Sequence, residues 1–279
     1  MLHIIEESVL DGVKLVPFLF LAYLAMEYLE HRTGEGVRGL MKGSGRVGPI
    51  LGGLLGAVPQ CGFSAAASNL YAGRVITLGT LMAIYLSTSD EMLPILISER
   101  VPWGIIIRIL LIKESVGAAA GLALDFLSHQ KGERGRERIH DICEQGRCRC
   151  EKGIFRSALS HTLQITFFIL IVNFGLNLAL HFAGEDALAG LLLDKPVLGP
   201  VLAGIVGLIP NCAGSVVITR LYLEGAMGLG ATLSGLLTGS GVGLLVLFGV
   251  NHDKRENLKI LGLLYCIGVG FGIIAGLWE

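Results

Sequence analysis

The sequence has little charge and few aromatic residues. Only 16% of its 279 residues are charged and 7% are aromatic, whereas 52% are hydrophobic and the mean hydropathy is +0.67. Soluble domains carry about 25% charged residues, so this composition excludes a disordered chain and argues against an ordinary soluble domain. The 22 basic and 23 acidic residues leave a formal net charge of −1, so no overall basic field attracts nucleic acid. We therefore predict an all-α polytopic membrane protein with no nucleic-acid partner.

Several functional motifs are also missing. The first ten residues contain no lysine or arginine, and the apolar run that follows has no small-residue cleavage site, so we predict no removable signal peptide. No phosphate-binding loop occurs, which argues against an ATPase. No nucleophile and base lie at a recognisable spacing, so we predict neither an enzyme nor a bound cofactor. The six cysteines are divided between apolar segments and one polar loop, and we expect free thiols rather than disulfides.

Long apolar runs dominate what is present. A helix of about 20 residues crosses the ~30 Å hydrocarbon core of a bilayer. Six runs reach this length, at residues 8–30, 75–98, 102–127, 155–182, 226–250 and 257–278. Two more, 47–73 and 198–223, are interrupted near the middle by Pro59-Gln60-Cys61-Gly62 and Pro210-Asn211-Cys212-Ala213-Gly214. We predict six spanning helices and two broken, re-entrant hairpins, which together make ten helical segments.

The two interrupted stretches also match each other. A shift of 151 residues without gaps aligns 47–61 with 198–212, and sets Pro-Gln-Cys at the first break on Pro-Asn-Cys at the second. The same shift pairs Gly117 with Gly268, so the chain is an internal duplication. We divide it into a first five-segment transmembrane repeat at 1–127, a loop at 128–154 and a second five-segment repeat at 155–279.

The positive charges predict the orientation of the chain. Eight lysines and arginines lie between residues 131 and 156, and loops with such an excess face the cytoplasm. This places loop 128–154 inside and both termini outside the cell (inner) membrane. Each half then crosses the membrane an odd number of times, so the two halves are inverted relative to each other. Inverted repeats with broken helices are the layout of secondary transporters.

Two cysteines mark the helix breaks. If the hairpins enter from opposite sides, Cys61 and Cys212 approach each other near the membrane midplane, beside Gln60 and Asn211. Thiolates prefer soft or borderline metals and trivalent arsenic, whereas amide and carbonyl oxygens suit harder ions such as manganese. The alternative is that cysteine serves as a small residue in a tight helix break.

Two carboxylates lie within the apolar run 75–98, at Asp90 and Glu91. A carboxylate at that depth costs about 2.5–3.5 kcal/mol, so it normally faces a cavity, a partner or a substrate. One interpretation is a cation ligand or proton carrier, and the other is a structural ion pair with Lys113. The second half has no carboxylate at the equivalent position, so the predicted pathway is asymmetric. The serines that flank this position in the two halves join the pathway: Ser87, Ser89 and Ser240.

The polar loop holds a compact group of metal ligands. One imidazole and three thiols lie within eleven residues, at His140, Cys143, Cys148 and Cys150. They suffice for a tetrahedral zinc-like site, although the spacing is not that of a zinc finger, and a solvated linker is the alternative. His161, at the cytoplasmic start of its helix, is either a proton relay or metal ligand of the pathway or a lone interfacial histidine.

Five motifs are distributed along almost the whole chain: Val58–Ser64, Ser87–Glu91, Cys148–Cys150 followed by Ser157–His161, Ile209–Ser215 and Gly235–Gly241. Together they resemble a known family, the ten-transmembrane heavy-metal exporters, whose members are labelled arsenic efflux proteins or manganese transporters. The resemblance implies a membrane protein of ten helices that exports a metal or metalloid.

We therefore predict a secondary active transporter that exports a manganese-like divalent cation or an arsenical and is coupled to protons. Its partners would be the lipid bilayer, the transported ion and protons, and the sequence leaves open whether it forms homo-oligomers. The alternative is a metal-responsive membrane sensor or docking protein that acts through the Cys/His loop.

Overall fold

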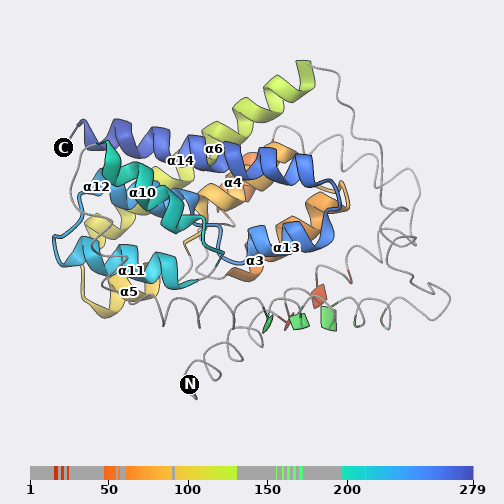
Figure 1. The fold of residues 1–279 in the computed structure, drawn as a ribbon, viewed down its shortest axis with the longest axis horizontal. Coiled ribbons are helices and arrows are strands. Elements are labelled where there is room, and N and C mark those ends of the chain that lie inside the picture. The colour runs from red at the N-terminus through yellow and green to blue at the C-terminus, as the bar shows by residue number, and fades with distance from the viewer. Residues whose placement is uncertain are drawn as a thin grey trace.

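The computed structural model describes residues 47–54, 56, 61–89, 92–130, 197–210 and 212–278. It also describes short helical pieces at 16–17, 20–21, 24, 155, 159, 162–163, 166–167 and 170–171 (Figure 1). Every regular element in these residues is a helix, and none of them lies in a strand. The predicted all-α class is therefore confirmed for the part of the chain that is described.

Nine helices have defined bounds in the part of the chain that the structure describes. In chain order they are α3 (Cys61–Ala72), α4 (Leu78–Ser87), α5 (Met92–Ser98), α6 (Trp103–Gln130), α10 (Leu198–Gly207), α11 (Cys212–Leu223), α12 (Leu229–Thr238), α13 (Gly243–Val250) and α14 (Lys254–Gly276). Residues 47–54 and 56 are helical as well. Both predicted broken stretches thus contain a helix on each side of the break.

The prediction that residues 75–98 and 226–250 each form one uninterrupted helix is wrong. The first run is divided into α4 and α5, and the second into α12 and α13. In the first, the hydroxyls of Ser87 and Thr88 donate to the carbonyls of Ala83 and Ile84, which competes with continued helical bonding. In the second, Gly241 has a positive φ of 54°, a conformation that glycine adopts without steric cost.

The helix boundaries repeat at the spacing of the sequence duplication. Both ends of α3 and α11, and both ends of α4 and α12, are separated by 151 residues. The starts of α5 and α13, and of α6 and α14, have the same separation. The turns that follow α3 and α11 also match, because Arg74 and Gly225 have positive φ angles of 58° and 71°. The duplication is therefore present in the backbone as well as in the sequence.

Glycines bring α4 onto α6 and α12 onto α14 in the same way. A β-carbon at Gly79 would overlap the carbonyl oxygen of Gly121, and one at Gly230 would lie 2.7 Å from the carbonyl oxygen of Gly272. A separation of 2.7 Å is too short for a carbon next to a backbone oxygen, so only glycine permits these approaches. The result is two tightly packed helix pairs, one in each half, which Figure 1 shows in the upper layer.

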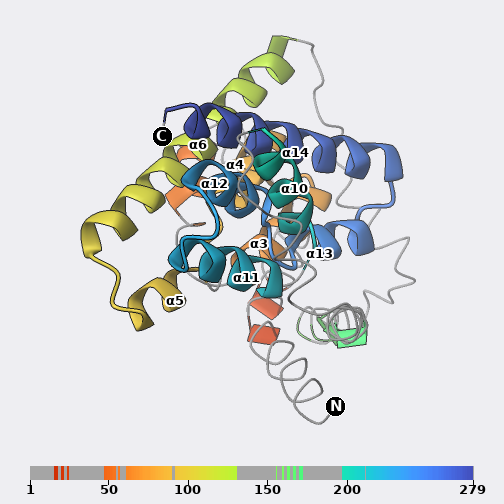
Figure 2. The same ribbon diagram turned by 60° about the vertical axis from the view of Figure 1, so that its left-hand side comes forward.

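The remaining short helices pack across the two halves. α3 of the first half lies against α13 of the second, and α11 of the second half lies against α5 of the first (Figures 1 and 2). α4 and α12 contact each other at the centre, where almost every residue of both helices is buried. Each half therefore completes its core with elements of the other.

Five elements meet at one end of the molecule, which we call the Arg74 end. Arg74 donates to both oxygens of Glu256, at 2.7 and 2.6 Å, and the Tyr71 hydroxyl donates to the same carboxylate at 2.6 Å. These bonds raise the pKa of the Arg74 guanidinium above its ordinary value. Asn251, directly after α13, donates to Glu256 at 3.2 Å.

Asp125, near the end of α6, lies at the same end of the molecule. It accepts hydrogen bonds from the Thr77 hydroxyl and the Gly79 amide, at 2.6 and 2.8 Å, and so caps the start of α4.

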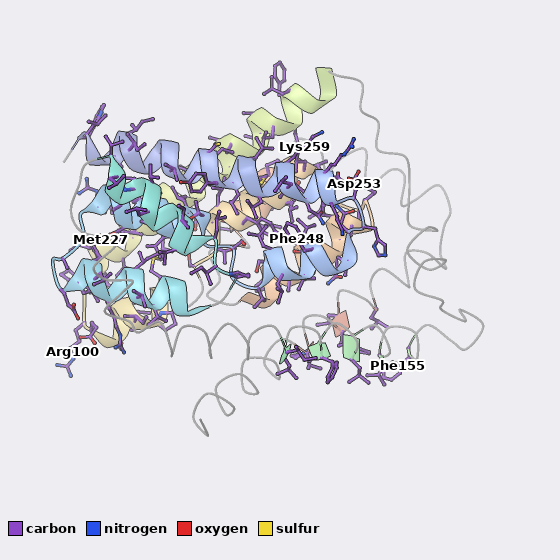
Figure 3. The ribbon with its side chains drawn as sticks, in the orientation of Figure 1. Arg100, Phe155, Met227, Phe248, Asp253 and Lys259 are labelled. Carbon is purple, nitrogen blue, oxygen red and sulfur yellow. The ribbon has the colours of Figure 1, made fainter. Side chains whose placement is uncertain are left out.

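These contacts establish the helix directions. α3, α6 and α13 end at the Arg74 end, whereas α4 and α14 begin there. Figure 3 shows Asp253 and Lys259 toward this end, and Arg100 and Met227 toward the opposite end. Arg100 follows α5 and Met227 follows α11, so these two short helices run away from the Arg74 end.

The outer surface of the described helices is apolar. Trp103 and Phe126 on α6 are each 65% exposed, as is Leu258 on α14. Within the described residues, two stretches are long and apolar enough to cross a membrane, Leu229–Val250 and Lys254–Gly276. Exposed apolar surface of this extent is typical of lipid contact rather than of a soluble monomer.

Two glycines on α14 test the helix packing. A β-carbon at Gly272 would overlap α12, whereas one at Gly270 would meet nothing within 4 Å. We expect Gly272→Ala to destabilise the protein by about 1–3 kcal/mol through overpacking. Gly270→Ala should leave stability unchanged or raise it by up to about 1 kcal/mol through helix propensity. Thermal unfolding in detergent measures both, and equal melting temperatures for the two variants would contradict the close packing of α12 and α14.

Candidate functional site

The described residues contain part of the predicted site. α3 begins at Cys61 and α11 begins at Cys212, so each cysteine lies at the first residue of a helix. Ser87, Ser89 and Ser240 are described with their side chains. The other predicted residues lie outside the described part of the chain: Gln60, Asn211, Asp90, Glu91, His161 and the loop ligands His140, Cys143, Cys148 and Cys150.

Two helix contacts match each other at the centre of the fold. In the first half, a β-carbon at Gly56 would overlap the hydroxyl of Ser87, so the helical residues 47–54 and 56 reach the end of α4. In the second half, a β-carbon at Gly207 would overlap the hydroxyl of Thr238, so α10 ends beside the end of α12. The last four carbonyls of a helix have no partner within it and carry partial negative charge. The ends of α4, α10 and α12 therefore direct carbonyl oxygens into the interior.

The hydroxyl groups at the end of α4 donate hydrogen bonds to carbonyls of the same segment. Ser87 donates to the Ala83 carbonyl at 2.7 Å, and Thr88 donates to the Ile84 carbonyl at 2.7 Å. Ser89 donates to the Ser87 carbonyl at 3.1 Å. All three side chains are buried. Since each hydroxyl uses its hydrogen on a neighbouring carbonyl, the oxygen lone pairs are what these residues offer to a ligand.

The break after α12 contains an unsatisfied hydroxyl. Ser240 is 1% exposed, and its Oγ has no hydrogen-bond partner among the residues that the structure describes. A buried polar atom without a partner costs about 1–3 kcal/mol, so it calls for an explanation such as a bound water or ion. Ser240 is the second-half equivalent of Ser89, and it was predicted from that pairing alone.

Lys113 lies between the two helix ends. It belongs to α6 and is 1% exposed, and its ammonium donates to the carbonyl oxygen of Thr88 and, at 2.8 Å, to that of Leu236. Thr88 caps the end of α4, and Leu236 lies in the last turn of α12. Sequence reasoning named Lys113 only as a partner for the carboxylates. Its charge inside an apolar run was the available signal, but its contact with α12 was not predictable.

A second polar group joins α3, α4 and α13. The Ser68 hydroxyl lies 2.7 Å from the Tyr85 hydroxyl and 2.7 Å from the Gly243 carbonyl oxygen. Ser68 and Tyr85 are completely buried. Sequence reasoning missed both residues, because a serine and a tyrosine in apolar runs give no signal above that of ordinary core packing.

The described residues provide hydroxyl and carbonyl oxygens as ligands rather than a group of metal-binding side chains. Among them, no group of three histidine, cysteine, aspartate or glutamate side chains is placed to hold a metal ion. Cys266 is a free thiol exposed on α14. What the described centre offers is hydroxyl and carbonyl oxygen, which suits hard cations or water.

Two serine-to-alanine variants test which hydroxyls at the centre have hydrogen-bond partners. Ser240→Ala removes a hydroxyl that has no partner, so we expect stability to stay the same or rise. Ser68→Ala leaves the buried Tyr85 hydroxyl without its partner and should cost about 1–3 kcal/mol. The measurement is thermal unfolding of both variants beside the unmodified protein. A loss of stability in Ser240→Ala as large as that in Ser68→Ala would show that the Ser240 hydroxyl has a structural partner.

Comparison with known proteins gives one match. Residues 116–252, about half of the chain, match the sequence model of a family described as "Putative, 10TM heavy-metal exporter". The matched range runs from the middle of α6 to the turn before α14, and includes the second helix break and Ser240. No curated protein and no solved structure matches the chain. The match supports the family resemblance drawn from the motifs, and over residues 116–252, just under half of its length, this chain is similar to the ten-transmembrane heavy-metal exporter family.

Proposed function

We propose that this protein is a secondary active transporter that exports a heavy metal or metalloid ion in exchange for protons. The observation that carries the proposal is that Gly56 meets the end of α4 and the end of α10 meets the end of α12 in the interior, beside a buried Ser240 hydroxyl that has no partner among the described residues. Broken helices whose ends meet near the midplane are how transporters of many folds bind ions. The family description, heavy-metal exporter, agrees with such a substrate.

We also propose an inverted arrangement of the two halves, which the directions of the described helices support. α4 begins at the Arg74 end and α5 ends at the opposite end, whereas α12 and α13 run the other way. α3 returns to the Arg74 end after its break and α11 returns to the opposite end. In this proposal, the first hairpin enters from one side of the membrane and the second from the other. Rocking of one half against the other would expose the centre to each side in turn.

The Arg74 end faces the cytoplasm in this proposal. Arg74, Lys254, Arg255 and Lys259 gather there, and positive residues at helix ends favour the cytoplasmic side. Loop 128–154 follows α6, which also ends there, so it is cytoplasmic too. Both termini are then outside the inner membrane.

The proposed ion pathway combines hard and soft ligands. Ser87, Ser89, Ser240 and the helix-end carbonyls supply oxygen, and Asp90 and Glu91 would bind the cation or carry the coupling proton. Cys61 and Cys212, at the starts of α3 and α11, would add thiolates for a softer ion. Gln60, Asn211 and His161 complete the proposed path. Manganese and arsenicals are the two substrate classes that these ligands fit.

Transport into proteoliposomes tests the function directly. Purified protein is reconstituted, and uptake of manganese, zinc, cadmium and arsenite is measured while the internal pH is recorded. We expect flux of one ion with protons moving in the opposite direction. Asp90→Asn combined with Glu91→Gln should abolish that flux without preventing insertion, and Ser240→Ala should reduce it in a protein of normal stability.

The matched control for the carboxylates is Glu99→Gln, which removes an acid from an exposed position after α5. This variant should transport like the unmodified protein. Undiminished flux in the Asp90 and Glu91 double variant would remove those carboxylates from the pathway. If folded protein took up none of the four ions, the transporter proposal would be overturned.

A deletion separates transport from metal sensing by the loop. In the transporter proposal, the membrane helices carry the ion, so a protein without residues 140–150 should keep most of its flux. Loss of metal binding with unchanged flux would assign the loop an accessory role. If the deletion abolished flux while thermal unfolding remained normal, the loop and not the helix breaks would be the essential element.

A further inference from the structure

An open groove lies between α6 and α14, the long helices of the two halves. It holds about 410 Å³ and is lined by Ser115, Val116, Ala119, Ala120 and Phe271. The only hydroxyl among these side chains, that of Ser115, donates to the Ile112 carbonyl of its own helix at 2.9 Å. The groove therefore offers a ligand apolar contacts and no free hydroxyl hydrogen.

The floor of the groove is part of the hydrophobic core that joins the two halves. Val116 is buried in a cluster of side chains from α3, α4, α12, α13 and α14, and Ala120 and Phe271 pack against the same cluster. Ala120 and Phe271 are separated by 151 residues, so equivalent positions of the two halves line one groove. A ligand in the groove would contact both halves at once.

The two tryptophans of the chain indicate where the membrane surface lies relative to the groove. Trp103 is the first residue of α6 and Trp278 follows the end of α14, so both lie at the end of the molecule opposite Arg74. Both are exposed, and exposed tryptophan at helix ends is typical of the lipid headgroup region. Ser115 is twelve residues from Trp103, or about 18 Å along α6. The groove therefore lies at the depth of the acyl chains.

Arg108 lies on α6 between this surface and the groove. It is exposed, and among the described residues it forms no hydrogen bond or ion pair. Ser115 is seven residues, or two helical turns, further along, so both side chains project from the same face at a separation of about 10 Å. Glu114, the nearest acidic residue of α6, projects about 120° away from Arg108.

An arginine without a partner at this depth needs an anion or the headgroup region. A charge inside the hydrocarbon region is costly, and a long side chain lowers that cost by extending toward the membrane surface. The guanidinium group also matches the geometry of phosphate, to which it donates two parallel hydrogen bonds. Arg108 thus provides the charge complementarity that the apolar groove lacks.

We propose that the groove binds an acyl chain of an anionic phospholipid whose phosphate is held by the Arg108 guanidinium. The chain follows α6 from Arg108 into the groove and extends the core that Val116 and Phe271 begin. A zwitterionic headgroup brings its own ammonium, which competes with the guanidinium for the phosphate, so an anionic headgroup is favoured. The bound lipid connects the two halves from outside. This inference goes beyond the proposed function and does not depend on the transported ion.

Lipid binding to delipidated protein in detergent tests the site. Thermal unfolding and native mass spectrometry follow titrations with phosphatidylglycerol, with phosphatidylcholine of the same chains, and with glycerol phosphate, which has no chains. We expect phosphatidylglycerol at a hundredfold excess over its Kd to raise the melting temperature by roughly 5 °C. Phosphatidylcholine should bind about tenfold more weakly, and glycerol phosphate should leave the melting temperature unchanged.

Removal of the guanidinium tests the headgroup contact. Arg108→Gln changes an exposed side chain and should weaken phosphatidylglycerol binding by about tenfold or more. The matched control is Arg220→Gln, which removes an exposed arginine from the last turn of α11. α11 ends at the same end of the molecule but lies away from α14 (Figures 1 and 2). This control should bind phosphatidylglycerol like the unmodified protein.

Filling the groove tests the acyl-chain contact separately and covers the case in which Arg108→Gln does not fold. Ala119→Phe adds a ring at an exposed position of the groove and leaves Arg108 in place. It should weaken phosphatidylglycerol binding without changing the response to glycerol phosphate.

Loss of phosphatidylglycerol binding in Arg108→Gln and Ala119→Phe, but not in Arg220→Gln, establishes the site. Equal binding of both phospholipids that neither variant changes would reveal only the ordinary lipid shell and overturn the inference. Glycerol phosphate that binds as tightly as phosphatidylglycerol would also overturn it, because the groove would then contribute nothing. A dimer that Ala119→Phe converts to monomers would show that a second copy of the chain, and not a lipid, covers the groove.

Discussion

The structure depends on satisfying the carbonyl groups of helices that end inside an apolar protein. α4 and α12 both end at the centre, where almost every residue of both helices is buried. The hydroxyls of Ser87 and Thr238 turn back onto their own helices, and the ammonium of Lys113 bonds to one carbonyl at each end. Without these donors, both breaks would leave buried polar atoms unpaired at a cost of about 1–3 kcal/mol each.

Close helix packing is what brings these donors within reach. Lys113 can bond to the end of α4 because glycine contacts draw α6 onto α4, as the approach of Gly117 to the Ala83 carbonyl shows. In the second half, Gly268 approaches the end of α12 at Thr238 in the same manner. The abundance of glycine in the sequence therefore has a specific result, which is a centre narrow enough for one side chain to bond with two helices.

The sequence predicted the repeat better than it predicted the site. The shift of 151 residues and the breaks before Cys61 and Cys212 are periodic and local features, and the helix boundaries follow them. The breaks after α4 and α12 were missed because no proline marks them. Their signals were a run of three hydroxyl residues and a Gly-Ser-Gly triplet in otherwise apolar runs. The bond between Lys113 and Leu236 joins residues 123 positions apart, and no local pattern encodes such a contact.

The two halves share the same backbone arrangement but not the same charged residues. This difference explains why there is one centre and not two. Matching halves give two similar arrangements of the same helices, which a rocking transporter needs. The charges are not duplicated, because Gly241, Val242 and Leu264 stand at the sequence positions equivalent to Asp90, Glu91 and Lys113. A second buried ammonium next to that of Lys113 would repel it strongly in a low dielectric. Among the described residues, the second half thus contributes the Leu236 carbonyl and the Ser240 hydroxyl, while the first contributes the Lys113 ammonium.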